Sequence, residues 1–189
     1  WSDQYDLKLQ IAGLSSGYDQ IVLRGEPAGR KFAAFYLAGG KLIAVGGANR
    51  FLAGKSDFGL IYKESESAEE EKQKFIRYED RSRNSISTYN PGSVYEVLTD
   101  NSHPLAFGYD DVYFSLKTSS SAFDYLENGW NVGRVGADAP RAGFTGYKAR
   151  QTLQNTLAFG VQNIGAGEVI YLIDNPLYRA FWENGKLLF

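Results

Sequence analysis

The chain has 189 residues, 43% of them hydrophobic, and its 20 basic and 22 acidic side chains give a net charge of −2. This composition is typical of a globular protein and excludes collagen-like and intrinsically disordered chains. With no cysteine and a single histidine, His103, the sequence excludes disulfides, thiolate metal sites, cysteine nucleophiles and histidine clusters.

Neither nucleic acid nor a membrane is an expected partner. The basic residues form no stripe that could follow a phosphate backbone. No apolar run approaches the ~20 residues that a spanning helix needs, and no signal-peptide pattern opens the chain. The chain starts at Trp1 and contains no methionine, which predicts a processed, excised or engineered segment.

The first 45 residues are predicted to form a short antiparallel β meander. Apolar and polar residues alternate over 7–11, and β-rich runs follow at 20–24, 32–37 and 41–45. Gly39-Gly40 separates the last two runs, a pattern typical of a hairpin. Because Leu42 to Val45 are all apolar, the fourth strand is predicted to be buried on both faces, with Ile43 in the core.

A charged segment interrupts the pattern at about 63–85. Glu69, Glu70 and Glu71 are followed by Lys72 and Lys74. Such mixed charge is typical of a solvated helix or loop, and an acidic docking site is the alternative.

The remainder is β-rich, and a helix is expected at its end. Strands are predicted at 93–98, 112–116, 131–135, 157–161 and 169–173, the last two joined as a hairpin by a glycine-containing loop. Residues 149–157 fit either a short helix or an extended segment. Residues 175–189 are predicted to be helical, with Pro176 near the first turn.

No residue pattern indicates a catalytic or metal site. Gly13-Leu14-Ser15-Ser16-Gly17 has the spacing of a nucleophile elbow, but a strand and not a helix follows, and only His103 could be its base. His103 has no second histidine for zinc, which favours a structural or exposed role. Asp110-Asp111 is predicted to be a turn, with a divalent-cation site as the alternative.

Aromatic residues make up 15% of the chain. Trp130, Phe181 and Trp182 are expected to pack in the core or at its rim. The same abundance could instead indicate a surface for a protein partner, since aromatic residues are enriched at interfaces.

The first quarter of the chain resembles the C-terminal domain of FAD-dependent ferredoxin reductases. The likeness is carried by residues 1–14, 18–25, 35–37 and 42–45. It implies that Trp1 occupies a position near the flavin. The FAD- and NAD-binding domains of that family are absent, so the resemblance implies no resident cofactor here.

Residues from about 39 to 189 resemble the glutamine-amidotransferase-like domain of large zinc carboxypeptidases. That likeness is carried by residues 39–47, 53–55, 58–60, the charged segment, 78–81, 100–109, 128–133 and 174–189. It implies an α/β fold with a mixed central sheet and flanking helices. The zinc ligands of that family lie outside this stretch.

These resemblances predict two parts, 1–45 and 46–189, spliced at the strand 39–45 that both share. We therefore expect a chimera, engineered or assembled, that acts as a non-enzymatic structural or protein-interaction domain. The alternatives are an accessory module of a flavin-dependent ferredoxin reductase and a non-catalytic part of a zinc carboxypeptidase. The two families imply a cytoplasmic origin for the first part and an exported one for the second.

Overall fold

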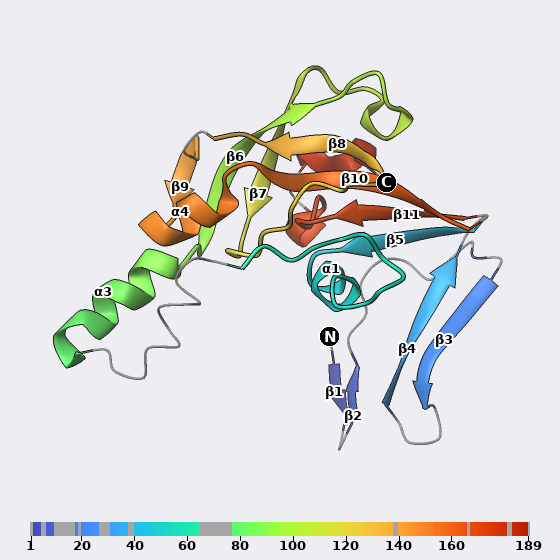
Figure 1. Cartoon of the computed structure of the whole chain (residues 1–189), viewed down its shortest axis with the longest axis horizontal. Helices are drawn as coiled ribbons and strands as arrows, with labels where there is room; N and C mark the ends of the chain where they lie inside the picture. Colours follow the sequence, from blue (N-terminus) through green and yellow to red (C-terminus); the bar gives the residue numbers. More distant parts are fainter. Residues whose placement is uncertain are drawn as a thin grey trace.

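A seven-stranded mixed sheet organises the computed structural model of the chain (Figure 1). Six strands follow one another in the order β5-β11-β10-β8-β6-β7, and β9 pairs with β6. All neighbours are antiparallel except β5 and β11, which are parallel. The structure describes residues 2–4, 7–9, 18, 20–26, 31–37, 40–64, 77–137, 140–165, 167–180 and 183–188.

The elements of this sheet follow the predicted β pattern closely. The strands are β5 (Lys41–Val45), β6 (Gly92–Thr99), β7 (Val112–Lys117), β8 (Trp130–Val135), β9 (Ala142–Phe144), β10 (Thr156–Ile164) and β11 (Gly167–Leu172). In the described part of the chain the α-helices are few and short: α1 (Gly47–Leu52), α3 (Tyr78–Thr88) and α4 (Tyr147–Leu153). A mixed α/β fold is therefore confirmed, whereas the amidotransferase-like arrangement of flanking helices is not.

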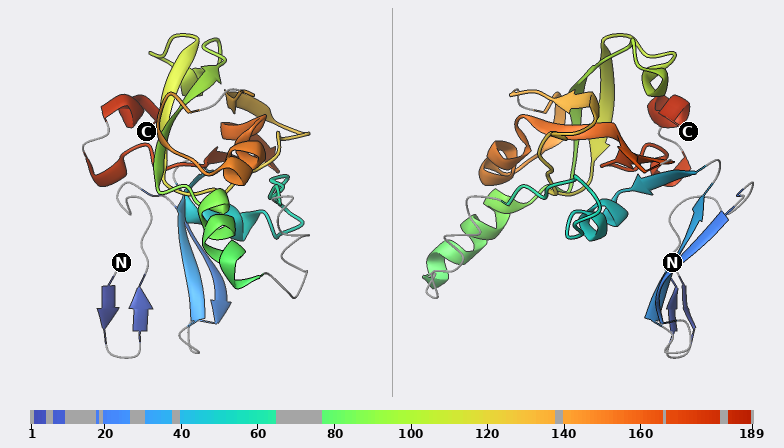
Figure 2. Two further views of the ribbon diagram at one scale, coloured as in Figure 1. Left: turned by 90° about the vertical axis from the view of Figure 1, so that its left-hand side faces the viewer. Right: turned by 45° about the vertical axis from the view of Figure 1, so that its right-hand side comes forward.

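The amino-terminal strands form two separate hairpins. The strands β1 (Ser2–Gln4) and β2 (Leu7–Leu9) pair with each other, as do β3 (Gln20–Glu26) and β4 (Lys31–Leu37). Figure 2 shows both hairpins projecting from the same side of the main sheet. The predicted hairpin at Gly39-Gly40 is wrong, because β5 leaves β4 and pairs with β11, more than a hundred residues away in sequence.

The strand β5 is an edge strand, which corrects the prediction that it is buried on both faces. In the described part of the chain it pairs only with β11, with Ile43 opposite Ile170. Ala44 is 2% exposed, but Ile43 on the other face is 44% exposed. A run of apolar residues can form either an edge strand or a central strand, so the sequence alone did not reveal that β5 has a neighbouring strand on one side only.

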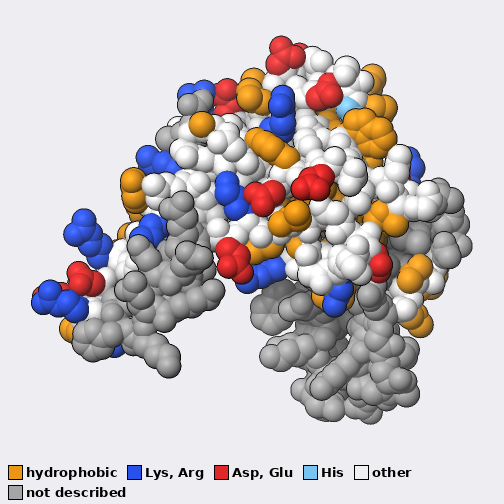
Figure 3. All heavy atoms as spheres, viewed as in Figure 1, with side chains coloured by type: hydrophobic (Ala, Val, Ile, Leu, Met, Phe, Trp, Pro, Cys, Tyr) orange, Lys and Arg blue, Asp and Glu red, His pale blue; other side chains and the backbone are white. Residues whose placement is uncertain are grey.

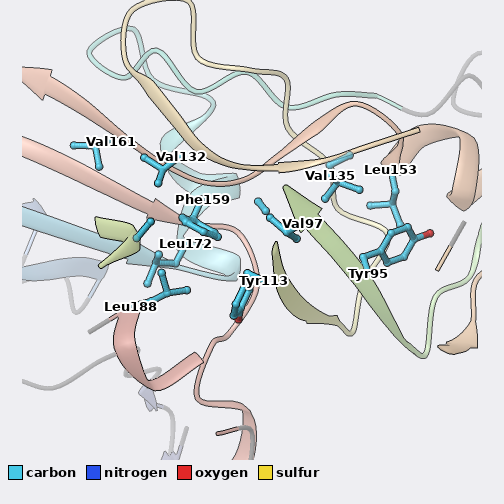
Figure 4. Close-up of a cluster of buried hydrophobic side chains, with 13 residues drawn as sticks. Tyr95, Val97, Tyr113, Val132, Val135, Leu153, Phe159, Val161, Leu172 and Leu188 are labelled. Atoms are coloured by element: carbon cyan, nitrogen blue, oxygen red, sulfur yellow. The ribbon is translucent and has the colours of Figure 1, made fainter. Parts of the chain in front are cut away.

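Two clusters of buried side chains lie against the sheet. The first joins β6, β7, β8, β10 and β11 to the carboxy-terminal segment and includes Tyr95, Tyr113, Phe159 and Leu188 (Figure 4). The second joins β5 and α1 to the later strands through Ala44, Leu52, Leu60, Phe123, Leu126, Leu157, Val169, Tyr171 and Ile173. Residues from both sides of the charged segment therefore share one core.

A buried ion pair holds the chain where it leaves β11. Lys117, 1% exposed at its side chain, places Nζ 3.0 Å from Oδ2 of Asp174, which is 10% exposed. The Ser115 hydroxyl donates to the same Oδ2 at 2.6 Å. Ser115 and Lys117 are two residues apart on β7 and so face the same side of the strand. Without these two donors the Asp174 carboxylate would be buried and unpaired.

The carboxy-terminal helix prediction is corrected to two 3₁₀ segments, η2 (Tyr178–Ala180) and η3 (Glu183–Leu188). Residues 149–157 divide between α4 and the start of β10, so both alternatives hold for part of the range.

Trp130 is 48% exposed and is not a core residue, while Phe181 and Trp182 lie outside the described residues. Among the described helices, none combines the length and apolar character needed to cross a bilayer.

Ile43 and Leu52 provide a direct test of the corrected core. Leu52 is 1% exposed, so Leu52→Ala should lower the free energy of unfolding by ~2–5 kcal/mol. Ile43→Ala should cost no more than about 1 kcal/mol, because half-exposed sites tolerate truncation. Urea unfolding followed by circular dichroism measures both. Two resolved transitions, with only one shifted by Leu52→Ala, would contradict a shared core.

The ion pair predicts a strong asymmetry between single and double variants. Lys117→Met should destabilise the protein by ~3–5 kcal/mol, because it leaves a buried carboxylate without its cation. Adding Asp174→Leu should restore much of that loss, since two apolar side chains need no partner. Equal destabilisation by the single and double variants would show that charge pairing is not what the site requires.

Candidate functional site

A mostly apolar groove beside β5 is the candidate functional site. Its volume is about 200 Å³. It is lined by Val22 of β3, Gly40 and Leu42 at the start of β5, Phe51 and Leu52 of α1, Phe58, and Ile164, Gly167, Glu168 and Val169 of the β10–β11 hairpin. The groove therefore draws on both the amino-terminal part of the chain and the carboxy-terminal hairpin.

Glycine conformations set the shape of the groove at β5. Gly40 and Gly46, at either end of this strand, have φ values of +74° and +55°. This left-handed region is readily accessible only to glycine, as expected for tight turns around the strand. Gly46 N–H donates to Leu172 O at 2.9 Å, and Asn49 Nδ2 donates to the same oxygen at 2.7 Å. These bonds attach the start of α1 to the end of β11.

Charged groups lie at the rim. Lys41 Nζ lies 2.8 Å from Glu168 Oε1, across the parallel pair β5–β11. The Lys55 ammonium lies 5.1 Å from the centre of the Phe51 ring, within cation–π range. Because Glu168 already has a cationic partner and the other lining side chains are apolar, the groove is suited to binding an apolar surface.

Gln162 connects the loop after α1 to the sheet next to the groove. Its Oε1 accepts from the Gly59 N–H at 2.9 Å and from the Tyr171 hydroxyl at 2.6 Å. Burial raises the pKa of Tyr171 to about 12, because the phenolate would lose its hydration in the core. Tyr171 therefore stays protonated over the physiological range and remains a donor to Gln162.

The arrangement does not resemble a catalytic constellation. Within the described ranges, no three His, Asp or Glu side chains lie close enough together to hold a metal ion. The alternative cation site at Asp110-Asp111 gains no support, because Asp111 Oδ1 accepts from Asn101 Nδ2 at 2.8 Å. What the groove offers is shape and apolar area.

His103 has the structural role that the sequence favoured. Its Nδ1 accepts from the Leu105 N–H at 3.1 Å and so caps the 3₁₀ turn η1 (Pro104–Ala106). Its ring lies 5.9 Å from that of Trp130. The elbow-like residues 13–17 and the flavin-adjacent candidate Trp1 lie outside the described residues. Among the described residues, neither His103 nor Asp110-Asp111 lines the groove. The helix α1, which forms one wall of the groove, has no sequence signature beyond its place after β5.

Comparison with known proteins identifies relatives for the amino-terminal third. A family model described as "Reductase C-terminal" matches residues 1–64. The putidaredoxin reductase of Pseudomonas putida is 50% identical over 50 residues, which are 26% of this chain and 12% of the relative. A probable ferredoxin reductase of Castellaniella defragrans is 51% identical over 45 residues, 24% of this chain and 11% of the relative.

These matches are local. The chain spans only about an eighth of the curated relatives that it matches. No solved structure matches it. The resemblance to ferredoxin reductases is thus supported within residues 1–64, while nothing in the comparisons supports the carboxypeptidase-like resemblance or a chimera.

The family match runs past the strand at which we expected a splice. It includes β5, α1 and the loop to residue 64. Six of the ten residues lining the groove fall within the match, and the other four belong to β10 and β11. The groove is therefore built jointly by the reductase-like segment and the rest of the chain.

The raised pKa of Tyr171 predicts a loss of stability at high pH. Between pH 10, the ordinary tyrosine value, and about pH 12, the unfolded chain releases this proton while the folded chain retains it. Unfolding is then favoured as pH rises. Urea unfolding at intervals across this range should give a steeper decline for the wild type than for Tyr171→Phe. Identical slopes would show that Tyr171 ionises equally well in the folded protein.

Proposed function

We propose that this chain is a non-catalytic accessory module of a flavin-dependent ferredoxin reductase. The observation that carries the proposal is the match of residues 1–64 to the reductase C-terminal family. The relatives bear the names of ferredoxin reductases, so the partner that we assign is the flavin-carrying part of such an enzyme. The chimera and the carboxypeptidase part are less favoured, because the comparisons support neither.

The proposed role is to bind the flavin-carrying part of the reductase and not to catalyse a reaction. The matched segment contributes most of the groove lining and exposes Ile21, Val22 and Leu23 on β3, at 45%, 41% and 55%. Because successive side chains of a strand point to opposite faces, this exposure means that both faces of the β3–β4 hairpin are uncovered at these three residues. Contact with a larger partner would bury these apolar side chains. Under this proposal Trp1 lies next to the flavin of that partner, and the chain holds no flavin of its own.

Reconstitution tests the proposal. The flavin- and NADH-binding part of putidaredoxin reductase, without its own C-terminal segment, would be titrated with this chain by calorimetry. Saturable binding is expected. Val22→Asp should weaken it at least tenfold, because a carboxylate in the groove would be buried without a partner. The matched control is Ile61→Asp, an exposed apolar residue that does not line the groove.

Three results would contradict the proposal: no binding, equal weakening by both variants, or a visible flavin absorbance band in the purified chain alone. The last would mean that the chain carries the cofactor itself. A functional readout is available in the same mixtures, since binding should change the rate of putidaredoxin reduction by NADH.

A further inference from the structure

A second surface, on the opposite part of the fold from the groove, carries exposed aromatic and basic side chains. It is formed by α3, β9 and α4, and we call it the α3–α4 surface. Its apolar members are Tyr78, Ile86, Tyr89, Phe144 and Tyr147, which are 88%, 57%, 59%, 49% and 69% exposed. No residue of α3 is buried, so this helix is not part of the protein's own core.

The two helices are held together at their junction. Gly146 N–H donates to Tyr89 O at 2.9 Å, and Lys148 Nζ donates to Asn84 Oδ1 at 3.2 Å. A side chain at Gly146 would collide with the Ile86 and Ser87 carbonyl oxygens, so glycine permits this close approach. The contact fixes the exposed residues of α3 relative to those of α4, and the surface is thus a defined arrangement.

Its charge is opposite to that of the rest of the molecule. The described residues 77–89 and 141–154 contain six basic and two acidic side chains, whereas the remaining residues contain fourteen basic and twenty acidic. Figure 3 shows basic side chains gathered over the α3 end of the molecule. Two of the basic residues are engaged, Arg77 with Glu79 and Arg141 with Glu96. Arg81 and Arg83 are exposed and have no carboxylate partner among the described residues.

Two buried polar groups, from Tyr95 and Arg150, lie beneath this surface. The Tyr95 hydroxyl and Arg150 Nε are buried without a hydrogen-bond partner in the described part of the chain. Burial raises the pKa of Tyr95, while the neighbouring Thr145 side chain and, to a smaller extent, the Arg150 charge lower it. Arg150 is only partly exposed, and among the described residues it forms no ion pair with a carboxylate.

From these observations we propose that the α3–α4 surface binds an acidic protein surface. A merely solvated surface would not display five large apolar side chains, and tyrosine and arginine are among the residues that dominate protein interfaces. The inference does not depend on the proposed function, because it uses none of residues 1–64.

A copolymer of glutamate and tyrosine serves as the probe for an acidic protein surface. Its binding to the whole chain, followed by fluorescence anisotropy in low salt, should be at least tenfold weaker for Arg81→Gln/Arg83→Gln. The control pair Arg50→Gln/Arg134→Gln removes the same charge from exposed arginines outside the surface and should change affinity less than twofold. Tyr78→Ser/Tyr147→Ser should weaken the binding that remains in high salt, where charge is screened.

Four outcomes would overturn the inference. They are absence of binding, equal losses for the two arginine pairs, tighter binding of single-stranded DNA with the same arginine dependence, and binding only after Glu69, Glu70 and Glu71 are changed to Gln. The last would mean that the chain's own acidic segment occupies the surface. Circular dichroism checks that each variant keeps its helix content, so a folding defect would be recognised separately.

Discussion

The parallel pairing of β5 with β11 is the constraint on which the rest of the structure depends. It joins two segments that are far apart in sequence. In its register Leu42 lies beside Val169 and Ala44 beside Tyr171, and all four belong to or pack against one buried cluster. The bonds from Gly46 and Asn49 to Leu172 O reinforce the same junction from the start of α1. Without this pairing, β5 would have no partner strand among the described residues, and the groove would lose one of its walls.

The same pairing argues against the splice that the two family resemblances predicted. The family match covers residues 1–64, yet its last part is built into a core with residues that lie outside the match. A splice at 39–45 would fall at β5, the strand that joins the two parts. The shared core instead favours a reductase-like segment around which the later strands are assembled, with the buried Lys117–Asp174 pair fixing the exit from β11.

The two candidate binding surfaces differ in polarity and charge. The groove is apolar, and its carboxylate, Glu168, is neutralised by Lys41, so it is suited to an apolar partner surface. The α3–α4 surface is basic and aromatic in a chain whose net charge is −2. Two surfaces of such different character can be occupied at once without competing for the same partner.

Most strands could be predicted from the sequence, because alternation and turn residues are local signals. The strands β3, β4, β6, β7 and β8 and the β10–β11 hairpin all lie where the pattern predicts. The absence of cysteine and the single histidine likewise fixed which chemistries were unavailable. Only the tertiary structure decided that β5 pairs with β11 and not with β4, that Ile43 lies at an exposed edge, and that η2 and η3 replace a terminal helix. These are properties of long-range contacts, and an apolar run such as 42–45 does not encode which distant strand will lie beside it.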